Sequence, residues 1–146
     1  MTIVRLYLDT APVIYVVEQV LPFFPVVDVR LSASGMVLVA SDLTRMECRV
    51  KPVREEKADL LKDYDEFFSS AVAEIVGLSR EVMDRATEIR ARHGFKTPDA
   101  IHLAAAVVAK CEVFLTNDHQ LDRFPDIAVE VVRPQPPTPQ ATPAAT

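Results

Sequence analysis

The sequence lacks the features that mark membrane, secreted and zinc-binding proteins. No apolar run is long enough to cross a bilayer, and the N-terminus has neither the basic leader nor the small-residue cleavage site of a signal peptide. Cys48 and Cys111 form no CxxC pair, which argues against a zinc site. We therefore expect a cytoplasmic protein with reduced cysteines and no membrane partner.

An excess of positive charge is also missing. The chain carries 16 Lys and Arg residues against 21 Asp and Glu residues, a formal net charge of -5 at pH 7. Such a balance argues against a protein that grips nucleic acid by surface charge alone. It does not exclude a nuclease whose bound cations meet the phosphates.

What the sequence does contain is apolar side chains, at 49% of 146 residues. This fraction predicts one globular domain with a substantial core, which we place at residues 1–132. Residues 133–146 hold five of the eleven prolines and no large apolar side chain. This segment cannot bury enough surface to fold, so we expect a disordered, proline-rich C-terminal tail.

Short apolar runs alternate with helical patterns along the domain. The runs are typical of strands buried on both faces. We expect strands at residues 3–8, 36–40, 72–78, 113–115 and 128–132. We expect helices after Asp9, at 26–34, from Ser41 or Asp42 to a break at Pro52, and at 55–69, 79–93 and 97–108. The pattern predicts a three-layer α/β/α fold with a central parallel sheet of four to five strands.

The segment 97–108 combines a leading carboxylate with an almost wholly apolar helix. Thr97 suits the N-cap and Pro98 the first helical position. The residues after Asp99 leave no broad polar face, so the helix is predicted to be buried. A carboxylate at the start of a buried helix needs a hydrogen bond, a paired charge or a cation. The simpler interpretation is that Asp99 favours the positive end of the helix dipole.

Three other acids occupy related places. Asp9 and Asp118 follow predicted strands, at the carboxyl ends where parallel sheets place their sites. Glu47 lies in the third helix, beside a predicted apolar face of Leu43, Met46 and Val50. Asp42, at the start of the helix that carries Glu47, suits a helix cap.

Four ionised carboxylates cannot crowd together without a counter-charge. Basic side chains or hard cations can supply it, and oxygen-rich clusters suit Mg²⁺ or Mn²⁺. With such ions bound, the expected chemistry is hydrolysis of a phosphodiester by metal-activated water.

These motifs together resemble the PIN domain family. The resemblance rests on Leu8-Asp9-Thr10, the helical glutamate, the string from Thr97 to Ala104, and Leu115-Thr116-Asn117-Asp118. It is most similar to the short VapC-type toxins of toxin–antitoxin pairs. The resemblance implies a Mg²⁺- or Mn²⁺-dependent ribonuclease, usually a homodimer, held inactive by a small antitoxin. The implied metal and catalytic residues are Asp9, Glu47, Asp99 and Asp118, with Thr10, Thr116, Asn117 and Asp122 as supporting candidates. Because some members of the family place the fourth acid a few residues later, Asp122 is a rival of Asp118, and the loose glutamate motif leaves Asp42 as a weaker rival of Glu47.

Two alternatives from another functional class stay open. A receiver-like signalling module has a similar fold, but it needs an acceptor Asp after the third strand and a Lys after the last. Here Gly77-Leu78 and Arg133 stand at those places. A PIN fold that binds a partner without catalysis is the other alternative, and the presence of all four acids argues against it.

Several further residues have a plain and a functional interpretation. We expect His102 to be packed or hydrogen-bonded rather than a metal ligand, His93 to be structural and His119 to be solvated. The basic residues around Glu47 form either a solvated face or a phosphate-contacting rim. They are Arg45, Arg49, Lys51 and Arg54. Tyr15, Phe23 and Phe24 belong either to the core or to a groove for a partner.

Overall fold

A computed structural model of the chain describes residues 2–134. The predicted tail at 133–146 therefore lies almost entirely outside the described residues. All strand pairs in the sheet are parallel, and the strand order is β3-β2-β1-β4-β5. The strands are β1 (Val4–Leu8), β2 (Met36–Ser41), β3 (Glu74–Val76), β4 (Val113–Thr116) and β5 (Ala128–Val131).

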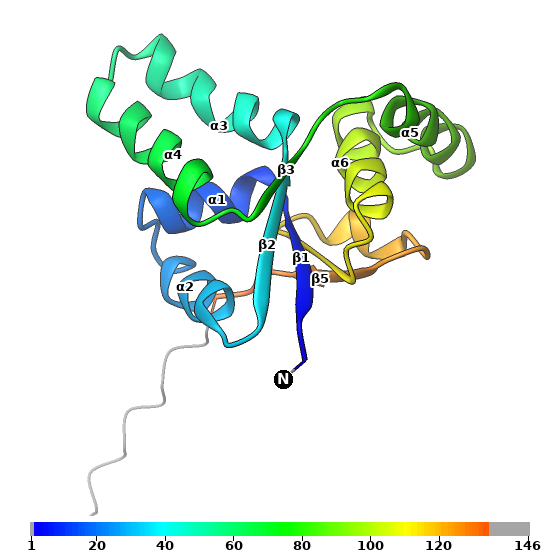
Figure 1. The fold of residues 1–146 in the computed structure, drawn as a ribbon, viewed down its shortest axis with the longest axis horizontal. Coiled ribbons are helices and arrows are strands. Elements are labelled where there is room, and N and C mark those ends of the chain that lie inside the picture. Colours follow the sequence, from blue (N-terminus) through cyan, green and yellow to red (C-terminus); the bar gives the residue numbers. More distant parts are fainter. Residues whose placement is uncertain (1, 135–146) are drawn as a thin grey trace, which may run out of the picture.

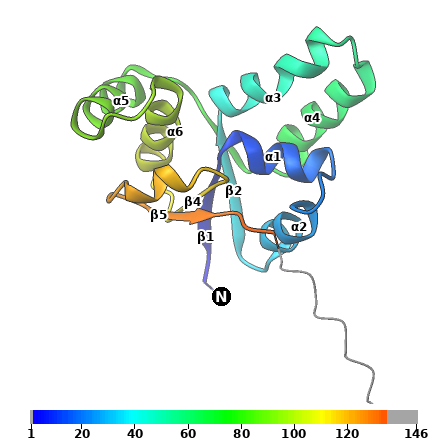
Figure 2. The same ribbon diagram turned by 180° about the vertical axis from the view of Figure 1, so that it is seen from behind.

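Helices cover both faces of this sheet (Figures 1 and 2). They are α1 (Thr10–Val17), α2 (Phe24–Ser32), α3 (Asp42–Arg54), α4 (Ala58–Ser70), α5 (Arg80–His93) and α6 (Thr97–Val108), with a 3₁₀ turn, η1 (His119–Arg123). α5 and α6 lie on one side of the sheet, and α1, α2 and α4 on the other. The predicted three-layer α/β/α fold is confirmed.

Alternation along β1 explains why both faces of the sheet are covered. Tyr7 packs into the core beneath α5 and α6, whereas Leu6 and Leu8 pack into the core beneath α1, α2 and α4. All three side chains are fully buried. A strand with apolar side chains on both faces is stable only where helices cover each face.

Helix α3 departs from the prediction in two ways. Ser41 caps it through a hydrogen bond from the Thr44 amide, but the helix continues past Pro52 to Arg54. Pro52 lies in the last turn and has no N–H to donate to the carbonyl of Cys48, so the helix continues there with one backbone hydrogen bond fewer. Met46 and Val50, predicted to share a buried face with Leu43, are 52% and 46% exposed. The face that α3 buries instead includes Thr44, Cys48 and Pro52.

Three smaller boundaries also differ. Lys96, not Thr97, occupies the N-cap of α6, so Pro98 stands at the second helical position. β3 covers only 74–76 of the predicted 72–78, because only one sheet edge is available to it and its side chains are partly exposed. α4 begins at Ala58 rather than at the predicted Glu55. The burial predicted for α6 is confirmed from Ala100 to Ala106.

The topology creates a switch point between β1 and β4. The chain runs outward from β1 through β2 to β3, then returns to place β4 on the other side of β1. Connections on the two sides of a switch point run in opposite directions, which leaves a crevice at the carboxyl ends of the strands. Asp9 follows β1 and Asp118 follows β4, so both border this crevice. Within residues 2–134, no helix combines the length and apolar character needed to cross a membrane.

Candidate active site

Asp9 is fixed at the carboxyl end of β1. Its side chain caps α1, with Oδ1 accepting a hydrogen bond from the Thr10 amide at 2.8 Å. Oδ2 accepts from Thr116 Oγ1 at 2.7 Å, and the Asp9 amide donates to the carbonyl of Leu115 at 3.0 Å. Only 9% of the residue is exposed. These contacts fix the carboxylate against the end of β4.

The same threonine orients the segment that carries Asp118. The Asp118 amide donates to Thr116 Oγ1 at 3.0 Å, so one hydroxyl contacts both Asp9 and the backbone of Asp118. Asp118 Oδ1 accepts from the Gln120 amide at 2.9 Å and caps η1. The predicted rival Asp122 lies on η1 and is exposed, whereas Asp118 is half-buried.

The supporting residue Asn117 points toward α1. Its Nδ2 donates to the hydroxyl of Tyr15 at 3.1 Å. The Tyr15 ring stacks on Phe23, with the ring centroids 4.3 Å apart. Phe23 and Tyr15 are partly buried against the core beneath α1 and α2. The two aromatic rings therefore pack against the core, and the Tyr15 hydroxyl accepts a hydrogen bond from Asn117.

Glu47 reaches the crevice from α3. Its Oε1 accepts hydrogen bonds from Thr10 Oγ1 at 2.7 Å and from His102 Nε2 at 2.6 Å. Partial burial raises the pKa of this carboxyl, but the hydrogen bonds from His102 and Thr10 outweigh burial and leave the pKa below its usual value. Glu47 is therefore held as a carboxylate at neutral pH.

His102 is 2% exposed and lies between two acids. Besides its contact with Glu47, Nε2 lies 3.5 Å from Asp9 Oδ1. Nδ1 is hydrogen-bonded to the Tyr7 hydroxyl at 2.8 Å. The prediction of a packed or hydrogen-bonded histidine is confirmed. Sequence reasoning missed Tyr7, although a tyrosine within a strand buried on both faces needs a polar partner for its hydroxyl.

Asp99 lies in the first turn of α6 and is half-buried. Burial raises its pKa, and repulsion from Asp9 and Asp118 raises it further, against smaller opposing effects of His102 and Lys96. The repulsion means that the three aspartates share one electrostatic environment. The charges of Asp9 and Asp118 thus act on Asp99, and Glu47 shares the partners Thr10 and His102 with Asp9.

The donor set of this crevice fits a hard cation. Each of the four acids offers carboxylate oxygens, which are the ligands that Mg²⁺ and Mn²⁺ prefer. A bound cation would relieve the repulsion that raises the pKa of Asp99. Among the described residues, however, no three His, Cys, Asp or Glu side chains already stand in an arrangement that could hold a metal ion. Ligation of a metal ion would therefore require side-chain adjustment within the crevice.

The basic residues of α3 are engaged with neighbouring helices. Arg49 Nε donates to Asp65 of α4 at 2.8 Å, and an Arg45 nitrogen lies 3.5 Å from the same carboxylate. Lys51 lies 3.6 Å from Glu18, which follows α1. These pairs connect α3 to α4 and α1, and their partly exposed side chains agree with the solvated-face interpretation.

An all-parallel α/β/α sandwich with carboxylates gathered at its switch point defines the class of fold. Within that class, the chain belongs to the PIN domain family, whose model matches residues 6–127. The match covers most of the domain, and the resemblance noted from the sequence is confirmed. No curated protein sequence matches the chain.

Solved structures support the same assignment. A chain of VapBC2 from Rickettsia felis, bound to a promoter DNA fragment, is 16% identical with a TM-score of 0.72, covering 88% of this chain and 99% of that one. A chain of a toxin–antitoxin complex from Klebsiella pneumoniae is 21% identical, with a TM-score of 0.67 and coverages of 84% and 94%. VapC20 of Mycobacterium tuberculosis, a Sarcin-Ricin loop cleaving toxin, is 14% identical, with a TM-score of 0.66 and coverages of 84% and 98%. At these identities the likeness establishes the VapC-type fold.

Proposed function

We propose that the protein is a metal-dependent endoribonuclease that acts as the toxin of a toxin–antitoxin pair. The observation that carries the proposal is the placement of acids at the carboxyl ends of β1 and β4. His102 Nε2 contacts Glu47 and lies 3.5 Å from Asp9, Thr116 contacts both Asp9 and the Asp118 amide, and the charges of Asp9 and Asp118 add to burial in raising the pKa of Asp99. Clustered carboxylates with mutually shifted pKa values are typical of functional sites. A purely structural role would not require three acids from separate elements to repel one another.

In the proposed site, Asp9, Asp99, Asp118 and Glu47 hold Mg²⁺ or Mn²⁺. A cation held there would supply an activated water and would stabilise the charge that develops on the phosphodiester. Thr116 holds Asp9 and the backbone of Asp118 in register. Thr10 fixes Asp9 through its amide and Glu47 through its hydroxyl. Asp118 is preferred to the exposed Asp122 because it contributes to the raised pKa of Asp99.

The proposed substrate is RNA, cut in the cytoplasm within a single-stranded or loop segment where backbone and bases are accessible. The proposed partners are a small antitoxin and a second copy of the chain. Two of the similar structures support the proposal of an antitoxin partner, because they are complexes of toxin–antitoxin systems. VapC20, which cleaves the Sarcin-Ricin loop, supports the choice of RNA.

The test is cleavage of a fluorescently labelled RNA with Mg²⁺ or Mn²⁺ present. Asp99→Asn should lower the rate at least about 100-fold, the scale seen when a group that stabilises transition-state charge is removed. Asp84→Asn is the matched control, because Asp84 is exposed on α5. Excess chelator should abolish cleavage by the wild-type protein.

An undiminished rate for folded Asp99→Asn, or in excess chelator, would contradict the proposal. Wild-type protein that binds the antitoxin but cleaves no RNA would point to the catalytically inactive alternative. The receiver-like alternative is not retained, because the chain belongs to the PIN domain family.

A further inference from the structure

We infer that His102 is the positioning residue of the acidic crevice. It holds Oε1 of Glu47 so that Oε2 remains available to a cation, and it separates Glu47 from Asp9. The inference rests on the proposed function, since it concerns how the metal-binding carboxylates are prepared. It assigns the role to His102 and its support Tyr7, neither of which is among the four acids.

The first step is the direction of the hydrogen bond. An ionised carboxylate only accepts hydrogen bonds, so His102 Nε2 must carry a proton where it contacts Glu47 Oε1 at 2.6 Å. The same nitrogen is 3.5 Å from Asp9 Oδ1. This N–H group is therefore hydrogen-bonded to Glu47 of α3, and the carboxylate of Asp9, at the end of β1, lies close to the same nitrogen. The partial positive charge of the N–H group reduces the repulsion between the two carboxylates.

The second step is the asymmetry of Glu47. Both hydrogen bonds that Glu47 accepts from described residues, from His102 and from Thr10, end on Oε1. Oε2 is left for another ligand. A carboxylate fixed through one oxygen presents the other in a defined direction. Such outer hydrogen bonds orient ligand carboxylates and raise metal affinity.

The third step is the support behind the imidazole. Tyr7 is fully buried, and its hydroxyl contacts His102 Nδ1 at 2.8 Å and Ser41 Oγ at 2.8 Å. Ser41 is the N-cap of α3, the helix that carries Glu47. The hydrogen bonds thus form a closed circuit from α6 through β1 to the start of α3 and back through Glu47. A buried polar network of this kind fixes geometry when every member is satisfied.

The described residues satisfy that condition. Among buried side-chain nitrogen and oxygen atoms of residues 2–134, none lacks a hydrogen-bond partner. Thr44 completes the network, with Oγ1 donating to the carbonyl of Leu8 at 3.2 Å. The ring of His102 therefore has one orientation, set by Tyr7 on one side and Glu47 on the other.

The test is Mn²⁺ binding in the absence of RNA, measured by titration calorimetry on the purified chain. A Gln side chain extends its amide as far as histidine Nε2, whereas Asn reaches only as far as Nδ1. His102→Asn should therefore weaken Mn²⁺ binding by about 10- to 100-fold, the scale reported for outer-shell partners of metal ligands. His102→Gln should retain the donor to Glu47 but lose the contact with Tyr7, and should therefore weaken Mn²⁺ binding less than His102→Asn does.

Two further variants complete the design. His93→Asn is the matched control, because the His93 ring packs against Phe95 and Phe124 rather than on a carboxylate. Tyr7→Phe removes the support and should weaken Mn²⁺ binding less than His102→Asn does. Circular dichroism verifies the fold of each variant. If His102→Asn does not fold, Tyr7→Phe decides the result.

The outcomes separate this inference from the proposed function. Wild-type protein that binds no Mn²⁺ would contradict the proposed metal site itself. Wild-type binding with unchanged affinity in folded His102→Asn, or in Tyr7→Phe if that variant decides, would overturn the positioning role and leave the proposed function standing. Equal losses in His102→Asn and His102→Gln would also overturn it, because the donor to Glu47 would then not be the cause.

Discussion

The ionised form of Asp99 is destabilised by its position in the folded protein. Its pKa is raised by burial and by the charges of Asp9 and Asp118, so the ionised form is disfavoured in the folded protein. An acid whose folded-state pKa exceeds its unfolded-state pKa binds its proton more tightly when folded. The folded state is therefore penalised at a pH above both pKa values, and the penalty fades as pH falls toward the unfolded-state pKa.

We predict that Asp99→Asn raises the free energy of unfolding at pH 7 in metal-free buffer. The gain should be no more than about 1 kcal/mol, because solvent screens the half-exposed carboxylate. It should shrink as the pH is lowered through the pKa of Asp99, where the wild-type side chain becomes neutral as well. Urea unfolding at several pH values measures the difference.

The control for this prediction is Asp84→Asn, at an exposed position on α5. Its unfolding free energy should change little at any pH. Lower stability of folded Asp99→Asn at pH 7 would show that Asp99 is satisfied by its surroundings and would remove the electrostatic argument for the site.

At the scale of elements, η1 and the loop before α6 are connected by one arginine. Arg123 Nη1 donates to the carbonyl of His93 at 2.7 Å, and the guanidinium lies 3.9 Å from the centre of the Phe95 ring. Phe95 is buried, and its carbonyl accepts from Arg90 Nη1 at 2.6 Å. Because Asp118 caps η1 and Asp99 lies in the first turn of α6, Arg123 connects the segments that carry both acids.

We predict that Arg123→Leu lowers the free energy of unfolding by about 1–2 kcal/mol. The loss combines a cation–π contact of about 0.5–1 kcal/mol with a hydrogen bond of about 1 kcal/mol. Mn²⁺ affinity should fall as well, since the spacing between Asp99 and Asp118 would relax. Urea unfolding and calorimetry measure the two effects.

Arg80→Leu, at an exposed position where α5 begins, is the control for loss of an arginine. Unchanged stability together with unchanged Mn²⁺ binding in Arg123→Leu would show that the segments hold their spacing without this contact.

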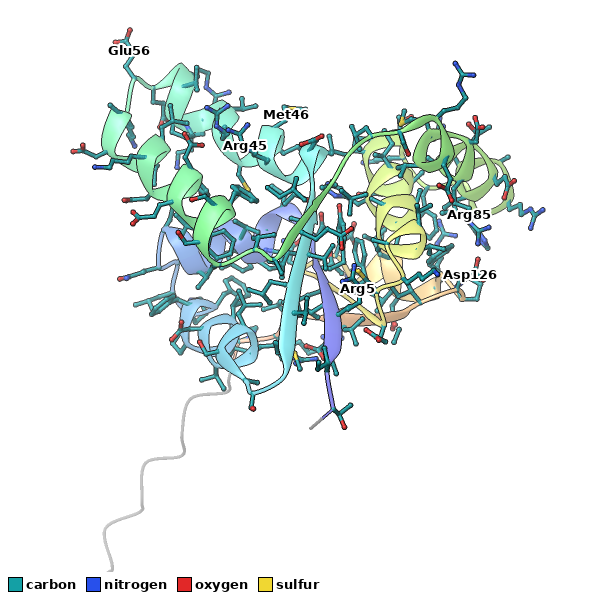
Figure 3. The ribbon with its side chains drawn as sticks, viewed as in Figure 1. Arg5, Arg45, Met46, Glu56, Arg85 and Asp126 are labelled. Atoms are coloured by element: carbon teal, nitrogen blue, oxygen red, sulfur yellow. The ribbon has the colours of Figure 1, made fainter. Side chains whose placement is uncertain are left out.

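At the scale of the whole molecule, α3 leaves apolar side chains uncovered. Met46, Val50 and Val53 follow one another at helical spacing and are 52%, 46% and 56% exposed. Figure 3 shows Met46 projecting from α3 away from the helix axis. Other parts of the surface carry ion pairs instead, such as that of Arg85 with Asp126 at 3.3 Å (Figure 3). A run of exposed apolar side chains on one helix is typical of a protein interface.

We predict that the homodimer proposed above forms through this stripe of Met46, Val50 and Val53. Val50→Glu should convert the dimer to a monomer, because a buried unpaired charge opposes association. Light scattering coupled to size exclusion measures the mass. Val29→Glu, at a 72% exposed position on α2, should leave the dimer intact. A wild-type mass equal to one chain at all concentrations would show that the dimer prediction is wrong.

The sequence was sufficient for the fold class because the hydrophobic period and the apolar content of each segment are local properties. Apolar runs such as 36–40 identify strands covered on both faces, and Ser41, Ser79 and Gly94 stand where the structure begins and ends helices. Boundaries failed where tertiary context overrides the local pattern. α3 continues past Pro52, and its buried face is set by contacts with α1, α4 and α6 rather than by its apolar spacing.

The sequence by itself determined which side chains carry charge and which elements hold them: Asp9 and Asp118 after strands, Asp99 at a helix start and Glu47 within a helix. Only the tertiary structure decided how they meet. Parallel strands in the order β3-β2-β1-β4-β5 place the ends of β1 and β4 side by side, and His102 and Tyr7 then fix Glu47 across the crevice. Such contacts join residues up to 107 positions apart, and no local pattern encodes a distance of that kind.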